Sequence, residues 1–270
     1  MIQIFYHVDD GPNWISVVSD QLNDLKPFAG VIHVGFLGTE KDKNLFLQLC
    51  QERQIYLAID FWDENLKLYE YPTLQLLWNY SKIHPGETIL YIHNKCSFFH
   101  NAADTQCLLW RRYMTHYIFN TPWHDKEFLV AGSLAVYTDP AHPDDIFFAG
   151  NFWYAKTDYV ALLSKPETQV ADRYPAETWI YEKIPRQDKL HSLLRLDDRI
   201  VYEKDMNQVI KQWATQVKST DNLNATETDV GLTVLIVLLV CSFIFYWIQV
   251  ISFASVSLSP RQTKSMKKPQ

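Results

Sequence analysis

The chain has 270 residues, of which 47% are hydrophobic, 21% are charged and 14% are aromatic, and its net charge is −6. This acidic balance argues against a nucleic-acid-binding surface, which needs clustered basic residues. The length allows one large domain with an appendage. The four cysteines form no Cys-x-x-Cys pair, which predicts reduced thiols and neither a disulfide framework nor a zinc site.

The first 93 residues alternate between strand and helix patterns. No basic region followed by an apolar stretch opens the chain, so we expect no cleaved signal peptide. Runs of β-branched and aromatic residues predict strands, and apolar residues three and four apart predict helices. This alternation predicts βαβ units and a mostly parallel sheet. The expected strands are 2–8, 30–37, 54–60 and 87–93, and the expected helices are 14–25, 41–51 and 71–83.

The alternation becomes irregular after residue 95. A long helix is expected over 105–119, followed by strands over 128–137 and 146–155. Two short helices are expected over 157–163 and 177–184. The fold class predicted from the whole pattern is α/β, with a Rossmann-like, mostly parallel sheet flanked by helices.

The C-terminal part predicts a membrane anchor. Residues 230–260 contain no charged side chain, and about 20 apolar residues are enough to cross a bilayer as a helix. We therefore expect four parts: a domain over 1–185, a polar and amphipathic stalk over 186–229, one transmembrane helix over 230–254, and a basic tail over 255–270.

Two cues disagree about the orientation of this predicted single-pass anchor. Basic residues after the span and acidic residues before it place the C-terminus in the cytoplasm and the main domain outside. The missing signal peptide argues against export of the domain. We favour the domain on the cytoplasmic side.

Polar residues follow several of the predicted strands. In open parallel sheets, ligands bind beyond the carboxyl ends of the strands. No Gly-x-Gly-x-x-Gly follows the first strand and no Gly-x-x-x-x-Gly-Lys-[Ser/Thr] occurs, which argues against a dinucleotide oxidoreductase and a P-loop ATPase. The strand ends nominate His7, Asp9, Asp10, Asp60, Asp63, His93, Asn94 and Lys95 as ligand-binding residues.

Four short motifs follow one another along the chain. Tyr91-Ile92-His93-Asn94-Lys95 ends the fourth strand and Trp110-Arg111 lies in the long helix. Ala149-Gly150-Asn151-Phe152-Trp153 and Ala176-Glu177-Thr178-Trp179-Ile180 come later, and Glu70-Tyr71-Pro72-Thr73-Leu74 precedes the first motif. Over residues 1–185 this order resembles a family of nucleotide-sugar glycosyltransferases with the GT-A fold, found in bacteria and large DNA viruses.

The resemblance implies a nucleotide-sugar donor and a glycan or lipid-linked acceptor. It has two departures. The Tyr-x-His-x-Lys motif usually continues with glycine, whereas Cys96 stands here. The wider GT-A pattern ends the fourth strand in Asp-x-Asp, which holds a divalent metal, whereas this chain has His93-Asn94-Lys95. Dependence on Mn²⁺ or Mg²⁺ stays open, and we assign no residue as a metal ligand.

Cations can replace a metal in glycosyl transfer, because negative charge builds on the leaving diphosphate. We predict that Lys95 acts as a point charge and Arg111 as a bidentate fork on the diphosphate; structural ion pairs are the alternative. His93 is expected to bind phosphate or to ligate a metal, with a structural histidine as the alternative.

The acceptor hydroxyl must also lose a proton. Glu177 opens a predicted helix and is our candidate for the general base; a helix-dipole partner is the alternative. Trp153 is expected to stack on a sugar and Asn151 to bind its hydroxyls, with core packing as the alternative. By fold analogy we assign nucleoside contacts to Tyr6, His7 and Asp60, and Asn94 joins the substrate-binding set.

Three functions remain open from the sequence. The first is glycosyl transfer of a hexosyl or deoxyhexosyl group at a membrane. The second is a non-catalytic membrane-anchored adaptor on the same fold, which the missing Asp-x-Asp supports. The third is another nucleotide-dependent transferase, such as a nucleotidyltransferase, which would release pyrophosphate.

Overall fold

The computed structural model describes residues 2–27, 30–98, 105–123, 126–137, 146–167, 172–184, 193–197, 200–202 and 205–217. The chain divides into two compact units, Met1–Ala214 and Thr215–Gln270. The fold described below is that of the first unit.

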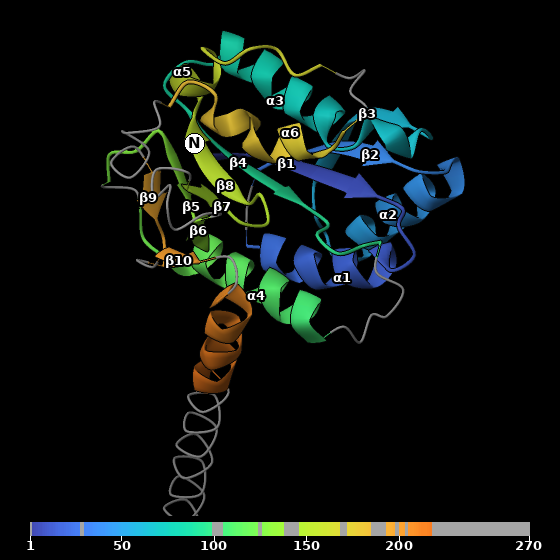
Figure 1. The fold of residues 1–270 in the computed structure, drawn as a ribbon. Coiled ribbons are helices and arrows are strands. Elements are labelled where there is room, and N and C mark those ends of the chain that lie inside the picture. The colour runs from blue at the N-terminus through green and yellow to red at the C-terminus, as the bar shows by residue number, and fades with distance from the viewer. Residues whose placement is uncertain are drawn as a thin grey trace, which may run out of the picture. The chain divides into compact units, whose positions relative to one another are not determined.

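A seven-stranded sheet forms the centre of this unit, in the order β3-β2-β1-β4-β8-β5-β9 (Figure 1). The first four of these strands are parallel, β8 is antiparallel to β4 and β5, and β9 is parallel to β5. The mostly parallel α/β sheet predicted from the sequence is therefore confirmed. The strands are β1 (Ile2–Asp9), β2 (Ile32–Leu37), β3 (Leu57–Asp63), β4 (Thr88–His93), β5 (Val130–Gly132), β8 (Trp153–Lys156) and β9 (Leu193–Arg195).

A second, three-stranded sheet has the order β10-β6-β7. It consists of β6 (Ala135–Tyr137), β7 (Ile146–Phe148) and β10 (Ile200–Tyr202). Only two residues, Ser133 and Leu134, separate β5 from β6. The backbone of Leu134 has a φ of 58°, so the chain turns there and passes from one sheet to the other.

Helices cover both faces of the large sheet (Figure 1). One hydrophobic core contains residues of α1, α2 and α4, and the other contains residues of α3, α5 and α6. Period-two alternation directs neighbouring strand residues to opposite cores. The helices are α1 (Trp14–Leu25), α2 (Glu40–Glu52), α3 (Tyr71–Ile83), α4 (Thr105–Asn120), α5 (Thr157–Val160) and α6 (Tyr174–Thr178), with single turns η1 (Leu66–Leu68) and η2 (Trp179–Tyr181).

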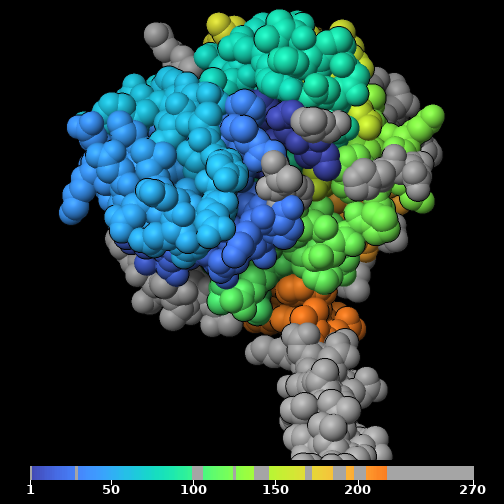
Figure 2. All heavy atoms as spheres, turned by 180° about the vertical axis from the view of Figure 1, so that it is seen from behind, coloured from blue at the N-terminus to red at the C-terminus, as the bar shows by residue number. Residues whose placement is uncertain are grey.

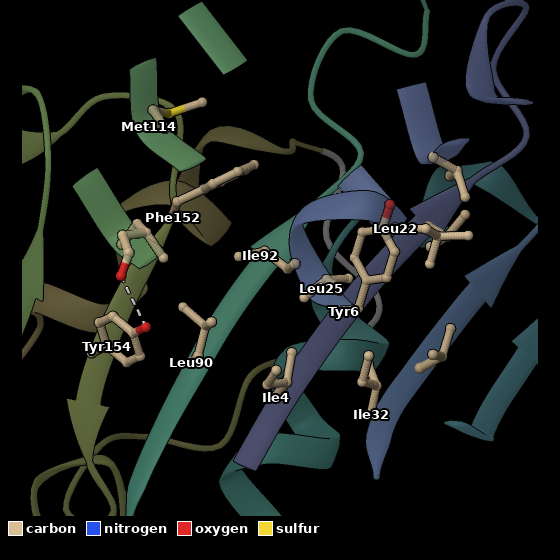
Figure 3. Close-up of a cluster of buried hydrophobic side chains, with 14 of the residues drawn as sticks. Ile4, Tyr6, Leu22, Leu25, Ile32, Leu90, Ile92, Met114, Phe152 and Tyr154 are labelled. Atoms are coloured by element: carbon tan, nitrogen blue, oxygen red, sulfur yellow. Dashed lines mark hydrogen bonds between the residues drawn. The ribbon is translucent and has the colours of Figure 1, made fainter. Parts of the chain in front are cut away.

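The α1 side of the sheet shows this alternation clearly (Figure 3). Ile4 and Tyr6 of β1 lie on the same face as Leu90 and Ile92 of β4, and all four belong to the core that includes Leu22 of α1. Seen from behind, α2 in light blue and α3 in teal cover separate edges of the molecule (Figure 2).

Local sequence explains where the helices begin. The Thr39 side chain accepts a hydrogen bond from the backbone N–H of Asp42 and so caps α2, whose first turn carries Glu40 and Asp42. Acidic side chains there complement the positive end of the helix dipole. Pro72 occupies the first turn of α3, where the missing N–H costs nothing.

The second half of the unit differs from the expected strands. The strand predicted over 128–137 is two short strands in different sheets, and the strand predicted over 146–155 is β7 and β8, separated by a turn. Gly150 and Asn151 in that turn have φ values of 93° and 58°. Left-handed backbone at two successive residues ends any continuous strand.

The prediction of reduced cysteines is wrong for two of the four. Cys96, after β4, forms a disulfide with Cys107 in α4, while Cys50 is free and buried. Their spacing matches no recognised motif, and only the fold brings the β4 end beside α4. The disulfide ties the residue after Lys95 to a helix.

The first unit extends to Ala214, so β9 and β10, from the segment expected to be a stalk, belong to its sheets. Within the described ranges no helix is long and apolar enough to cross a membrane. The predicted transmembrane helix over 230–254 and the basic tail over 255–270 lie outside those ranges.

Candidate functional site

A cavity of about 310 Å³ lies at the carboxyl ends of β1 and β4. The strand order 3-2-1-4 reverses between these two strands, and open α/β sheets bind ligands in the crevice outside such a switch point. The walls come from the carboxyl ends of β1 and β2, from the segment after β4, from α4, from the segment before α3, from β7 and the β7–β8 turn, and from α6 with the residue before it. Segments far apart in the sequence therefore meet in one hollow.

Strand alternation decides which residues of β1 reach the cavity. His7 and Asp9 line it. Tyr6 points to the opposite face, where its hydroxyl donates to Gln21 Oε1 of α1 at 2.8 Å. The cavity therefore includes His7 from our sequence prediction but not Tyr6, because adjacent strand residues face opposite sides.

Asn94 fastens the end of β4 to the end of β1. Its Oδ1 accepts from the Asp9 backbone N–H at 3.1 Å, and its Nδ2 donates to the Asp9 carbonyl at 2.7 Å. Asn94 also lines the cavity, and each of its side-chain polar atoms makes one bond in this clamp. The clamp holds Asp9 in place, and the expected contact of Asn94 with a substrate stays a prediction.

The Asp9 carboxylate is 9% exposed and has fixed donors. Its Oδ1 accepts from Ser97 Oγ at 2.5 Å and from the Gly11 N–H at 3.2 Å. Burial raises the pKa of Asp9 to about 6, against the partial compensation of these hydrogen bonds. A buried carboxyl with a raised pKa in a cleft is typical of functional sites.

This shift predicts that Asp9 makes the protein less stable as the pH rises. The folded pKa lies above the ordinary value of 3.8, so the folded state binds more protons than the unfolded state between about pH 4 and pH 6, and stability falls across that window. Asp9→Asn keeps the oxygen that accepts from Ser97. We expect it to raise the free energy of unfolding in urea by up to about 2–3 kcal/mol at pH 7.5, with little change at pH 4. An equal gain at both pH values would contradict the assignment.

Two histidines of the cavity are neutral at neutral pH. His7 Nδ1 lies 2.9 Å from Thr73 Oγ1 of α3, and His93 Nε2 lies 2.8 Å from the Gly150 carbonyl oxygen. Burial lowers the pKa of His7 to about 4 and that of His93 to about 3. Their predicted contacts with ligand are therefore those of neutral imidazoles.

Two cations line the cavity, Lys95 and Arg173. The Lys95 ammonium lies 4.7 Å from the centre of the Trp110 ring, and the Arg173 guanidinium lies 5.1 Å from the Tyr174 ring. Neither pairs with a carboxylate of the described residues. They are therefore available to an anionic ligand.

Arg111, which we expected to grip the diphosphate, lies behind Lys95. It is 5% exposed and does not line the cavity. Its guanidinium donates to the Lys95 carbonyl at 3.3 Å and pairs with Asp20 of α1 at 3.5 Å. It holds the backbone of Lys95 in place and has no direct path to a ligand in the cavity.

Glu177 and Glu70 both line the cavity, and the structure brings Glu177 together with Lys95 and His93 as predicted. The Glu177 carboxylate, in the first turn of α6, forms no hydrogen bond to another described residue. Glu70 was not among the expected site residues. Glu70 lies just before the first turn of α3. In the sequence it was noted only as part of the Glu70-Tyr71-Pro72 segment.

Three other expected substrate contacts lie outside the cavity lining. Asn151 is 1% exposed and Trp153 is 0% exposed; Trp153 donates to Asn151, and Asn151 donates to Glu70. Asp60 lies on β3, where its carboxylate pairs with His33 at 2.6 Å. Gly150, beside Asn151, does reach the cavity.

Backbone strain gathers around this site. Tyr69, Cys96 and Asn151 have positive φ values of 50°, 73° and 58°. Such conformations are costly for residues with a Cβ and persist where the surroundings enforce them, often at ligand sites. The glycine expected after Lys95 from the resemblance fits this backbone better than the cysteine that stands there.

Aromatic side chains surround the opening. Phe98 is 52% exposed and Tyr174 is 61% exposed, and both line the cavity with Tyr69 and Trp110. Flat exposed rings suit stacking on sugars or nucleobases. Within the described part of the chain, no group of three or more metal-ligating side chains is present.

Residues 3–181 match the family described as Domain of unknown function (DUF8361), and the chain belongs to this family. No curated protein matches the chain.

Among solved structures, glucosyl-3-phosphoglycerate synthase from Mycobacterium tuberculosis is similar. Its complex with Mn²⁺, UDP and glucosyl-3-phosphoglycerate is 10% identical, covering 75% of this chain and 69% of that chain, with a TM-score of 0.38. Its complex with UDP is 11% identical over the same shares, also with a TM-score of 0.38. A likeness at this level supports no residue assignment.

Proposed function

We propose that the chain is a GT-A-like glycosyltransferase that moves a sugar from a nucleotide-sugar donor to a hydroxyl of a glycan or lipid-linked acceptor. The observation that carries the proposal is the cavity at the carboxyl ends of β1 and β4, where two cations and a carboxylate meet that have no ion-pair partner in the described part of the chain. Cations can stabilise the leaving diphosphate, and a carboxylate can accept the proton of the attacking hydroxyl.

Lys95 and Arg173 are the groups proposed to bind the diphosphate. Both lack a carboxylate partner among the described residues, and aromatic side chains line the cavity beside them. A cation held in place at the cavity wall can stabilise the negative charge that develops on the leaving diphosphate. His93-Asn94-Lys95 puts a cation where Asp-x-Asp would hold a metal, so we draw no step through a metal.

Glu177 is the proposed base. The acceptor oxygen forms a bond to the anomeric carbon while the bond from that carbon to the phosphate oxygen breaks. The electron pair of the broken bond stays on the nucleoside diphosphate, and the hydroxyl proton passes to Glu177. We further propose that residues 230–254 attach the enzyme to a membrane beside its acceptor.

Ligand binding tests this proposal directly. The full chain is heated with UDP, GDP, ADP, CDP or dTDP and with their common sugars, with added Mn²⁺ or Mg²⁺ and with EDTA. At saturating ligand we expect the melting temperature to rise by roughly 5 °C or more, and Lys95→Ala to remove most of the rise because the diphosphate loses one of its two proposed cations.

Lys41→Ala is the matched control, because Lys41 is an exposed lysine of α2 that does not line the cavity; it should respond as the unmodified chain does. No response to any nucleotide or nucleotide sugar, with or without metal, would refute the proposal. Release of pyrophosphate would instead indicate a nucleotidyltransferase.

A further inference from the structure

Three segments that are distant in the sequence converge on the carboxylate of Glu70. Tyr91 Oη of β4 donates to Glu70 Oε2 at 2.6 Å, and Asn151 Nδ2 donates to the same oxygen at 2.7 Å. Trp153 Nε1 donates to Asn151 Oδ1 at 2.8 Å. Because an indole N–H can only donate, it fixes which end of the Asn151 amide faces Glu70. One oxygen of Glu70 is thus fully occupied and its orientation is fixed.

The other oxygen, Glu70 Oε1, has no donor among the described residues and lies 3.6 Å from His93 Nδ1. His93 Nε2 faces the Gly150 carbonyl, which can only accept, so Nε2 carries the hydrogen. Burial, together with the charges of Lys95 and Arg173, lowers the pKa of His93 to about 3 against the opposing effects of the Gly150 hydrogen bond and Glu177. The ring is therefore neutral, and Nδ1 presents a lone pair.

Two acceptors thus face each other with no hydrogen between them. Both side chains line the cavity, and they are only 15% and 10% exposed. Both acceptors lie at the cavity wall. A ligand that supplies a hydrogen there forms a charge-assisted hydrogen bond with Glu70. Glu70 Oε1 and His93 Nδ1 can therefore accept hydrogen bonds from a ligand.

The proposed function identifies which part of the ligand lies here. Lys95, the proposed diphosphate group, follows His93 by two residues, and its charge acts on the His93 ring. The transferred sugar is bonded directly to the diphosphate, so its hydroxyls lie next to Lys95. We infer that Glu70 Oε1 and His93 Nδ1 form a subsite that binds a hydroxyl of the donor sugar. This inference rests on the proposed function.

Glu70→Gln reverses the chemistry of the subsite without disturbing its support. The amide oxygen of the new side chain accepts from Tyr91 and Asn151 as Oε2 does now. Its amide nitrogen then faces His93 Nδ1 and the cavity as a donor. Glu87→Gln is the matched control, because Glu87 Oε2 accepts from Tyr80 Oη at 2.7 Å and lies outside the cavity lining.

The measurement is the affinity, by calorimetry, of the nucleotide sugar that stabilises the unmodified chain and of its nucleoside diphosphate. In Glu70→Gln we expect the nucleotide sugar to bind about 10- to 100-fold more weakly relative to the diphosphate. The diphosphate alone should bind equally or more tightly, because a negative charge is removed. Glu87→Gln should leave both affinities within about twofold.

Three results overturn the inference, each for a different reason. If diphosphate and nucleotide sugar both bind but Glu70→Gln leaves their ratio unchanged, the subsite fails while the proposed function stands. If nothing binds the unmodified chain, the proposed function and the subsite fail together. If ¹⁵N NMR of labelled histidine shows the proton on Nδ1 of His93 and not on Nε2, the acceptor pair does not exist, whatever binds.

Discussion

Glu177→Gln is expected to lower the rate of sugar transfer by about 10²- to 10⁴-fold, which is the usual contribution of a positioned general base. The amide has nearly the shape of the carboxylate but cannot take a proton. The side chain forms no hydrogen bond to another described residue, so its replacement should leave the fold and the nucleotide affinity unchanged. Steady-state transfer to an identified acceptor measures kcat, and calorimetry measures nucleotide binding in the same variant.

Glu127→Gln is the control for this experiment. Glu127 is exposed and does not line the cavity, so the variant should transfer sugar at the unmodified rate. A Glu177→Gln enzyme with unchanged kcat would contradict the assignment of the base. The proton would then have to pass to another carboxylate of the cavity, and Asp9 and Glu70 are the other carboxylates among its described lining residues.

The parallel half of the sheet could be predicted from the sequence because its elements are long and regular. The helix expected over 14–25 has those bounds in the structure, and the strand expected over 2–8 ends at Asp9. Apolar periodicity over six or more residues reports burial directly. The end of each strand then located His7, His93 and Lys95 at one edge of the sheet.

The second half could not be predicted in the same way. Its strands are three or four residues long, which is too short to show an alternation of apolar and polar residues. Their boundaries are set by backbone turns at Leu134 and at Gly150-Asn151. The sequence does not indicate a left-handed turn at Leu134, because residues other than glycine rarely adopt a positive φ.

Within the site, the sequence located the segments but not the direction of each side chain. Tyr6 and His7 are neighbours at the end of β1 and point to opposite faces of the sheet. Which of them lines the cavity depends on which face α3 packs against. The segment with Asn151 and Trp153 was nominated from the sequence, and in the structure Asn151 donates to Glu70 and accepts from Trp153. Glu70 itself follows no predicted strand, so the rule that ligands bind at strand ends could not nominate it.

The network around Glu70 changes the meaning of the recognised motifs. Tyr91, Asn151 and Trp153 are buried and bond to one another or to Glu70, so they are positioning residues for a carboxylate at the cavity wall. A rigid support of this kind holds a binding group within a narrow geometry. These side chains, which the sequence motifs nominated, therefore support a residue that lines the cavity.

Trp153→Ala is expected to lower the free energy of unfolding by about 3–5 kcal/mol, as for other fully buried aromatic residues. The Trp153 ring is 0% exposed and stacks on Tyr91, with 5.1 Å between ring centres. Its removal leaves a cavity beneath the sheet and frees the Asn151 amide. Urea unfolding at neutral pH measures the change.

Trp62→Ala is the control. Trp62 is 38% exposed on β3, and the Lys43 ammonium lies over its ring. We expect this substitution to lower the free energy of unfolding by about 1 kcal/mol. A stacking role of Trp153 on a sugar predicts the opposite pattern. The protein would keep its stability and lose affinity for the nucleotide sugar. Because a fully buried ring has no face left for a ligand, we expect Trp153→Ala to lose stability first, and to lose sugar affinity only through the displaced Glu70.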